Sequence, residues 1–181
     1  VFTSWEIMCF GRVASGETFD HGQLRQSVRI TLSGKSLWQE FGNLRGGDPM
    51  MQSPAGLAGC TVAATLIVAG KTISAELLGL CRDIAVDEAA GEHCGITLLP
   101  DVLIARYLGH RSEAAKRYFI ALWQLLRPLA AGRPVALPRI WQTYSFGSCA
   151  LNPLLTNNNV GMALPPLVKA KLLISTAALL A

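Results

Sequence analysis

Residues 24–32 alternate apolar and polar side chains with a period of two, the pattern of a strand with one buried face. The apolar side holds Leu24, Val28, Ile30 and Leu32, and the polar side holds Arg25, Ser27, Arg29 and Thr31. The turn residues Ser33-Gly34-Lys35 follow, and a second strand-like run covers 37–44. The pattern therefore predicts an antiparallel hairpin.

Four more segments, at 2–10, 60–69, 95–99 and 102–108, are rich in apolar, aromatic and β-branched residues and predict further strands. Two segments have helical periodicity instead. The stripe of the first helix, over 73–85, is Ile73, Leu77, Leu80, Cys81 and Ile84. The stripe of the second, over 112–126, is Ala115, Tyr118, Phe119, Leu122, Leu125 and Leu126. We expect Pro128 to end this second helix. The fold class expected is α+β, predominantly β, with antiparallel or mixed sheets and these two helices.

With 181 residues, of which 51% are hydrophobic and 15% charged, the chain is large enough for one domain with a sizeable core. The texture changes after residue 143, because no charge occurs from 140 to 168 while Asn and Pro recur. We therefore expect a domain over 1–143 and a weakly structured extension over 144–181. Ser53-Pro54 predicts the start of one short helical turn.

Charge is distributed unevenly, with a net of −3 over residues 1–113 and +7 over 114–181. A basic end can meet nucleic acid or an acidic partner, but scattered basic residues also occur where acids are simply lacking. The five cysteines include no C-x-x-C pair, which argues against a disulfide framework and a structural zinc site. We expect reduced thiols and a cytoplasmic location without a membrane anchor, because no signal-like start is present and the apolar end is short.

Five ordered blocks resemble the C-terminal part of the urease accessory protein UreD family, also called UreH. They are SWEIMCFGRVASGETFDHG at 4–22, GGDPMMQSPAGLAG at 46–59, LLPDVLIARYLG at 98–109, ALWQLLRP at 121–128 and PRIWQT at 138–143. The residues that carry the motif include Gly11, Arg12, Ser15, Gly16, Glu17, Gly46, Asp48, Pro49, Ser53, Pro54, Gly56 and Arg106. Val13 stands where the family usually has Pro.

The resemblance implies a scaffold and metallochaperone, not an enzyme, with a predominantly β fold and two helices. Proteins of this family join UreF, UreG and apo-urease, and the complex delivers nickel in the cytoplasm. They are thought to provide an internal path for the metal, so a transient Ni²⁺ is expected and no tightly bound cofactor. The family also has a substantial N-terminal part, and the sequence here is expected to lack it.

Three side chains in the first block are candidates for the nickel path, Glu17, His21 and Cys9, because nickel accepts carboxylate, imidazole and thiolate ligands. The competing interpretation makes Cys9 a core residue and Asp20-His21-Gly22 a turn. Glu17 is the preferred candidate because it belongs to the preserved motif. The basic face of the second helix, Lys116 and Arg117, is the expected surface for partner proteins.

Two other function classes stay open on the residues alone. Cys9 and His21 could form a Cys–His hydrolase site, although neither lies in a recognised nucleophile motif. Residues 60–126 read strand, helix, strand, strand, helix, the order of a split-βαβ RNA-binding module. Such a module needs exposed aromatic side chains on its central strands, and Tyr107 is the one candidate there.

Overall fold

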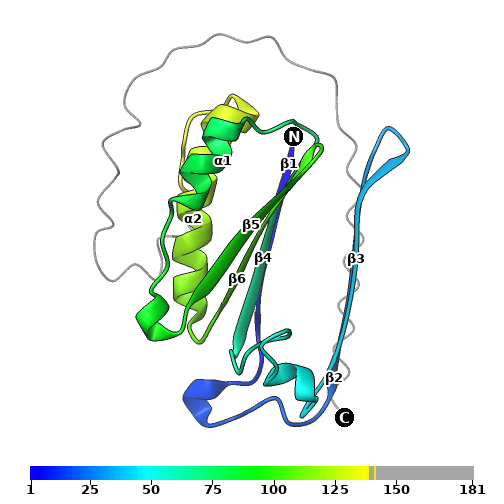
Figure 1. Ribbon diagram of the computed structural model, residues 1–181, viewed down its shortest axis with the longest axis vertical. Coiled ribbons are helices and arrows are strands. Elements are labelled where there is room, and N and C mark those ends of the chain that lie inside the picture. The colour runs from blue at the N-terminus through cyan, green and yellow to red at the C-terminus, as the bar shows by residue number, and fades with distance from the viewer. Residues whose placement is uncertain (139–140, 142–181) are drawn as a thin grey trace.

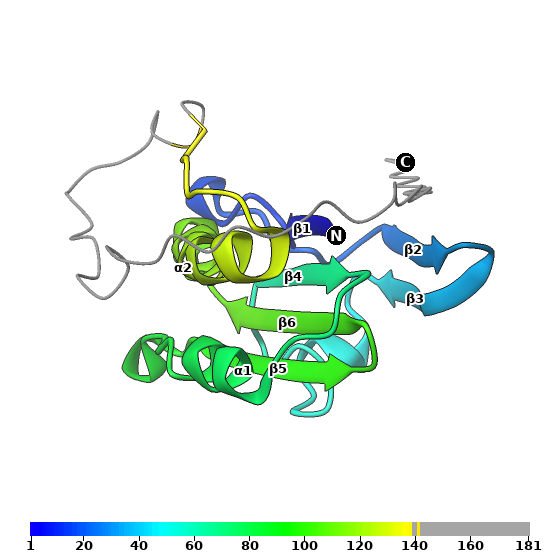
Figure 2. The same cartoon turned by 90° about the horizontal axis from the view of Figure 1, so that it is seen from above.

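The computed structural model describes residues 1–138 and 141, which build three layers (Figure 1). A four-stranded sheet forms the middle layer, two helices cover one of its faces, and a two-stranded hairpin lies against the other. Seen from above, the helices and the hairpin lie on opposite sides of β4 (Figure 2). The predicted α+β, predominantly β class is confirmed. The extension predicted over 144–181 lies outside the described residues.

All six predicted strands are present, and every pairing among the described residues is antiparallel. The strands are β1 (Phe2–Cys9), β2 (Gln23–Leu32), β3 (Lys35–Arg45), β4 (Val62–Ala69), β5 (His93–Leu99) and β6 (Val102–Gly109). The four-stranded sheet has the order β1-β4-β6-β5, and β2 pairs only with β3 among the described strands. The hairpin predicted from the alternation of residues 24–32 is therefore confirmed.

The two central strands, β4 and β6, are buried on both faces, which explains why their sequences are almost continuously apolar. One set of alternate side chains, including Leu66, Leu103 and Tyr107, packs against the helices. The other set, including Ile67 and Ile104, packs against Val28 and Ile30 of β2 and belongs to a second, smaller core. The middle sheet therefore separates two cores.

The helix predicted over 73–85 is shorter in the structure, where α1 covers Ala75–Arg82. Ser74 caps it by accepting a hydrogen bond from the Leu77 backbone N–H at 3.2 Å, so Ile73 precedes the helix. Leu77 and Cys81 are buried as predicted, but Leu80 is 47% exposed. The predicted buried stripe therefore included one residue, Leu80, that is exposed in the structure.

The helix predicted over 112–126 is longer than expected, since α2 covers Ser112–Ala131 and continues through Pro128. A proline inside a helix costs about 3 kcal/mol. Burial on both sides of it offsets that cost, because Leu126 and Ala130 both belong to the large core. The helix ends at Gly132, which adopts a left-handed conformation. Neither helix of the described residues is long and apolar enough to cross a membrane.

A short 3-10 helix covers Pro49–Met51, just before the helical turn that was predicted to start at Ser53. Asp48 is its cap and accepts a hydrogen bond from the Met50 backbone N–H at 2.8 Å. Ser53 instead opens a turn, in which its carbonyl accepts from the backbone N–H groups of Gly56 and Ala58. The helix start predicted at Ser53-Pro54 is therefore wrong, because these residues open a turn.

Candidate functional site

A row of polar side chains crosses the middle sheet on the face that looks toward the hairpin. The strand register places Glu6 of β1 opposite Thr65 of β4, and Thr65 opposite Arg106 of β6. Side chains that are directly opposite in adjacent strands share a face. The neighbours of Arg106 on that face of β6 include Ile104, which packs in the hairpin-side core. On this face of the sheet, the polar row therefore begins where the apolar residues of the hairpin-side core end.

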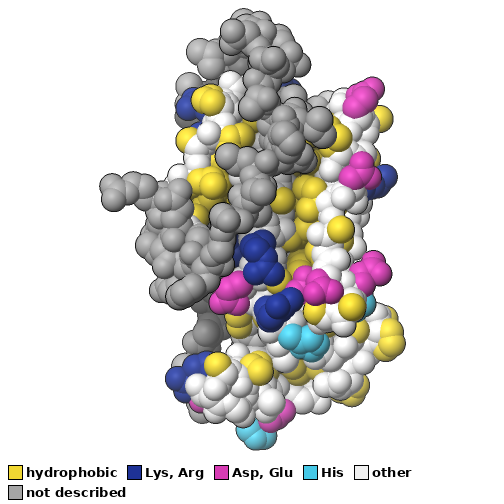
Figure 3. Space-filling model, turned by 90° about the vertical axis from the view of Figure 1, so that its left-hand side faces the viewer, with side chains coloured by type: hydrophobic (Ala, Val, Ile, Leu, Met, Phe, Trp, Pro, Cys, Tyr) yellow, Lys and Arg dark blue, Asp and Glu magenta, His cyan; other side chains and the backbone are white. Residues whose placement is uncertain are grey.

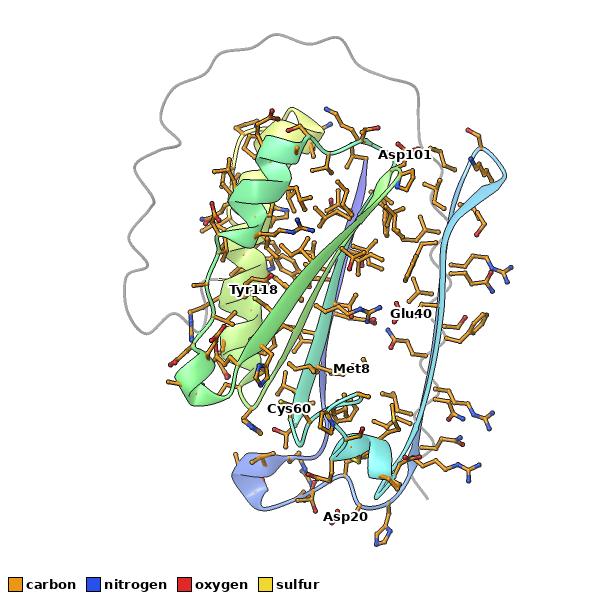
Figure 4. All side chains as sticks on the ribbon, in the orientation of Figure 1. Met8, Asp20, Glu40, Cys60, Asp101 and Tyr118 are labelled. Atoms are coloured by element: carbon orange, nitrogen blue, oxygen red, sulfur yellow. The ribbon has the colours of Figure 1, made fainter. Side chains whose placement is uncertain are left out.

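Two polar side chains of the hairpin meet this row. Arg106 donates to the Glu40 carboxylate at 2.7 Å and lies 3.4 Å from the Thr65 hydroxyl. Gln26 of β2 donates through its side-chain amide to Glu6. Figure 4 shows Glu40 extending from β3 toward the middle sheet. Among the described residues, the hairpin and the sheet are therefore joined by one ion pair and one hydrogen bond between side chains.

The two carboxylates of this site have different electrostatic surroundings. Burial raises the pKa of Glu6, and the negative charge of Glu40 adds to that rise, whereas the hydrogen bond from Gln26 and the charge of Arg106 oppose it. Glu40 lies directly against the Arg106 guanidinium, and its side chain is 24% exposed. Burial is the largest of these effects, so the protonated form of Glu6 is favoured more than that of an ordinary carboxyl.

A cavity of about 480 Å³ opens beside the polar row, between the two sheets and the segment around residues 50–57. Its walls include Met8, Ala63 and Leu108 from the next row of the middle sheet and Gly42 from β3. Figure 4 shows Met8 below Glu40 on the same side of the sheet. Ala63 and Gly42 leave the space open because they carry little or no side chain. Thr65, Arg106, Gln26 and Glu40 are the polar groups that reach this space from the row.

The loop that holds the predicted nickel ligands is fixed by close backbone contacts. Gly11 has a φ of +88°, and a Cβ there would lie 2.5 Å from the Glu17 carbonyl oxygen. Gly46 approaches the same loop at its other end, where a Cβ would lie 2.4 Å from the His21 backbone nitrogen. Only glycine fits such approaches, and Gly11 also needs its positive φ. The loop is therefore tied to both β1 and the end of β3.

Within this loop, Glu17 forms an ion pair with Arg12 through two hydrogen bonds, of 2.8 and 2.5 Å. That pairing holds the pKa of Glu17 below its ordinary value. The side chains of Arg12 and Glu17 are 76% and 50% exposed, so the pair is solvated. Val13, the departure from the family pattern, is exposed in the short 3-10 turn Val13–Ser15 between them.

The structure does not assemble the three predicted nickel ligands into a site. Glu17 is paired with Arg12, while His21 and Cys9 are exposed and have no side-chain partner in the described residues. No group of three or more His, Cys, Asp or Glu side chains suited to a metal ion occurs in the part of the chain that is described. The exposure of Cys9 is at odds with the competing interpretation of a core cysteine.

The predicted partner residues Lys116 and Arg117 differ in their surroundings. Arg117 is exposed, whereas Lys116 is half-buried and its ammonium donates to the Trp141 carbonyl at 3.1 Å. The Trp141 ring also packs at a tilt against Trp5 of β1 and meets Trp123 of α2 edge to face, with ring centroids 4.7 and 5.2 Å apart. On this side of the molecule, Lys and Arg side chains lie among acidic ones (Figure 3).

A second buried carboxylate lies at the start of α2. Glu92 is 4% exposed, accepts from Arg111 at 2.6 Å and from the Asp87 backbone N–H at 3.2 Å. Burial would raise the pKa of Glu92, but these hydrogen bonds and the Arg111 charge outweigh it, so the pKa is lowered. Burial and the nearby Glu92 charge raise the pKa of Tyr107 to about 12. The ion pair between Glu92 and Arg111 fastens the start of α2 to the start of β5.

The inter-sheet site was largely missed in the sequence analysis, which singled out Arg106 alone. The available signal was a charged or polar residue inside an otherwise apolar strand, as with Glu6 in SWEIM and Arg106 in VLIARYL. Glu40 gave no such signal, because an acid in a half-buried strand normally faces water. The pairing of Glu40 with Arg106 depends on how the hairpin docks, and period alone does not specify that.

Comparison with known proteins decides the family. A family model described as UreD urease accessory protein matches residues 1–142. This chain belongs to the UreD family. A urease accessory protein UreD of Azoarcus sp. strain BH72 is 46% identical over 143 residues, which are 79% of this chain and 49% of the relative. The UreD of Janthinobacterium sp. strain Marseille is 47% identical over 138 residues, 76% of this chain and 47% of the relative.

The chain thus spans about half the length of the curated UreD relatives that it matches. The resemblance stated from the five blocks is confirmed. These relatives are named urease accessory proteins.

The RNA-binding alternative meets a structural obstacle. Strands β4 and β5 flank β6 in the predicted split-βαβ arrangement. However, the hairpin covers the face of β4 and β6 that the helices leave free. Tyr107, the expected stacking residue, is 1% exposed and packs on the helix side. In the described residues, the central strands therefore present no aromatic platform of the kind that stacks bases.

Proposed function

We propose that this chain acts in urease maturation as a cytoplasmic, non-enzymatic scaffold that helps to pass nickel to apo-urease, together with UreF and UreG. The observation that supports this most directly is family membership over residues 1–142. The inter-sheet cavity supports the proposal, because it is a space between the two sheets with the Glu40 carboxylate on its wall and Glu6 in the adjoining polar row.

The chemistry of the polar row suits transient handling of a divalent cation. Carboxylate and hydroxyl oxygens from Glu6, Glu40 and Thr65 can each contact Ni²⁺, but no thiolate or imidazole adds to the row. Burial disfavours the charged form of Glu6 that would bind the metal, and Glu40 must exchange Arg106 for it. Both effects weaken binding, and a passing ion must not be held tightly.

Two routes for the metal can then be compared. One runs through the cavity past Glu40 to Glu6 in the adjoining polar row, and the other follows the outer loop with Glu17, His21 and Cys9. We favour the cavity, because Glu17 is paired with Arg12 in a solvated loop, whereas Glu6 is partly desolvated between the sheets.

The test uses a chimera in which residues 1–142 replace the matching half of the full-length Azoarcus UreD, expressed with urease and its other accessory proteins. Urease activity and the nickel content of purified urease are measured together. We expect Glu6→Gln with Glu40→Gln to lower both. Glu76→Gln on the exposed surface of α1 is the matched control and should leave both unchanged.

If Glu17→Ala lowers urease activity and nickel content while the Glu6→Gln, Glu40→Gln double variant changes neither, the metal route moves to the loop. Urease that stays fully active and fully nickel-loaded in both the double variant and Glu17→Ala would overturn the proposed nickel passage.

The partner surface proposed at Lys116 and Arg117 needs a separate experiment. We expect Arg117→Glu to weaken co-purification of the chimera with UreF at moderate salt. Lys116→Glu changes two things, because it also removes the contact with the Trp141 carbonyl. Arg117→Glu alone therefore tests the surface, and an unchanged complex would show that this side of α2 does not contact UreF.

A further inference from the structure

The β2–β3 hairpin carries its charges on opposite sides. Residues 23–45 contain four basic residues and a single acid, Glu40. Glu40 faces inward and is neutralised by Arg106. Arg25, Arg29 and Arg45 are exposed and have no side-chain hydrogen bond or ion pair within the described residues. The outer face of the hairpin is therefore basic, and its single acid lies on the inner face, where it is paired with Arg106.

The register shows what this outer face contains. Four cross-strand pairs lie on it, namely Gln23 with Arg45, Arg25 with Asn43, Ser27 with Phe41, and Arg29 with Gln39. Phe41 is 69% exposed, the most exposed large apolar side chain of the described residues. Arg25 and Arg29 lie two positions to either side of Ser27, its cross-strand partner, so both are diagonal neighbours of Phe41. An exposed aromatic ring thus lies between two unpaired guanidinium groups.

We propose that the outer face of the β2–β3 hairpin docks an acidic protein segment that carries an apolar side chain between its carboxylates. Charge complementarity argues for this occupant, because the face has three cations without partners and no acid. Arginine forms bidentate pairs with carboxylates, and the apolar side chain of the segment would cover Phe41. Arg25 and Arg29 are about 13 Å apart along the strand, the span of four residues in an extended segment.

Two other occupants fit the face less well. β3 has 11 residues and is therefore about 35 Å long. A nucleic-acid strand carries a charge about every 3.4 Å, so three arginines would leave most phosphates without a partner. A second copy of this chain would bring the same basic face against itself, and like charges repel. An acidic protein segment needs only two or three carboxylates. This inference is independent of the nickel route, since none of its residues lies in the cavity-side row.

The experiment measures binding to the full 181-residue chain by fluorescence anisotropy. The probe is a labelled peptide with a central leucine flanked by glutamates, compared with the same peptide with glutamines and with a labelled oligothymidylate. We expect the acidic peptide to bind most tightly and its binding to weaken as salt is raised. The double change Arg25→Gln with Arg29→Gln should weaken this binding about fivefold or more. The change Phe41→Ser should also weaken it.

Lys71→Gln with Arg133→Gln is the matched control, because it removes the same charge from exposed positions outside the hairpin. It should weaken binding of the acidic peptide by less than about twofold. Arg25→Lys with Arg29→Lys keeps the charge and should retain more affinity than the glutamine pair. An equal loss in the control pair would overturn the proposal by showing a general charge effect. So would tighter binding of the oligothymidylate that depends on Arg25 and Arg29, or equal binding of the glutamine peptide.

Discussion

Arg106 of β6 and Glu40 of β3 form an ion pair with a nitrogen–oxygen distance of 2.7 Å, across the space between the middle sheet and the hairpin. In the described residues, it is the one ion pair that links these two layers. Its side chains are 49% and 24% exposed, so water screens it in part. Together with the Gln26–Glu6 hydrogen bond and the apolar contacts of Val28 and Ile30, the pair holds the hairpin over the cavity.

We predict that Arg106→Met and Glu40→Gln will each lower the free energy of unfolding by about 1–2 kcal/mol. The double variant should lose less than the sum, with a coupling of about 0.5–1 kcal/mol. Urea denaturation of all four proteins gives the coupling. Arg29→Met is the control, since Arg29 is exposed on the outer face, and its effect should stay within about 0.5 kcal/mol. Strict additivity would show that the ion pair contributes nothing.

Glu6→Gln tests the raised pKa of Glu6. A carboxyl with a raised pKa makes the folded protein bind more protons than the unfolded chain, so stability falls as pH rises above the ordinary value of 4.5. Glutamine resembles the protonated form and can still accept from Gln26. We expect similar stabilities in acid and a variant that is increasingly more stable than the parent toward neutral pH, measured by urea denaturation. A parent that is more stable than the variant at neutral pH would contradict this.

Glu92→Gln should behave in the opposite way. The lowered pKa of Glu92 stabilises the fold above the ordinary value of 4.5, and this contribution is lost as pH falls through the folded-state pKa. We expect the variant to lose about 1–3 kcal/mol at neutral pH and the difference to shrink in acid. Thermal unfolding followed across pH measures it. A difference that stays constant with pH would mean that packing at Glu92, and not its charge, matters.

Gly11→Ala should loosen the loop that carries Glu17. Its Cβ would lie 2.5 Å from the Glu17 carbonyl oxygen at a φ of +88°, so the loop must shift. We expect a loss of roughly 1–3 kcal/mol and faster proteolysis within residues 11–22. Gly16→Ala is the matched control, because Gly16 also has a positive φ, of +75°, but nothing within 4 Å of its Cβ position. Equal losses in the two variants would exclude steric contact as the cause.

Sequence patterns were sufficient for the elements because each strand and helix has a local signal. The alternation of residues 24–32 and the apolar runs of β4 and β6 predicted their strands and the degree of their burial. The errors lie at helix ends, where tertiary packing outweighs local preference. Pro128 is tolerated inside α2 because Leu126 and Ala130 are buried on either side of it.

The candidate site was harder to predict because its residues come from five strands. Glu6, Gln26, Glu40, Thr65 and Arg106 meet only after the hairpin folds over the sheet. The residues predicted from the sequence, such as Glu17 and His21, are instead close together in the chain. Local proximity identified a well-ordered loop, with Arg12 and Glu17 joined, but it did not identify a metal site.

The four tryptophans divide between the two sides of the middle sheet, so their fluorescence can report on each side. Trp5, Trp123 and Trp141 lie together where β1, α2 and the segment after α2 meet, whereas Trp38 packs in the hairpin-side core. Replacing Trp38 with phenylalanine leaves emission that reports only on the helical layer. Keeping Trp38 as the sole tryptophan gives a protein whose emission reports when the hairpin lifts from the sheet. The chain therefore carries the probes needed to watch its two cores open separately, without an added dye.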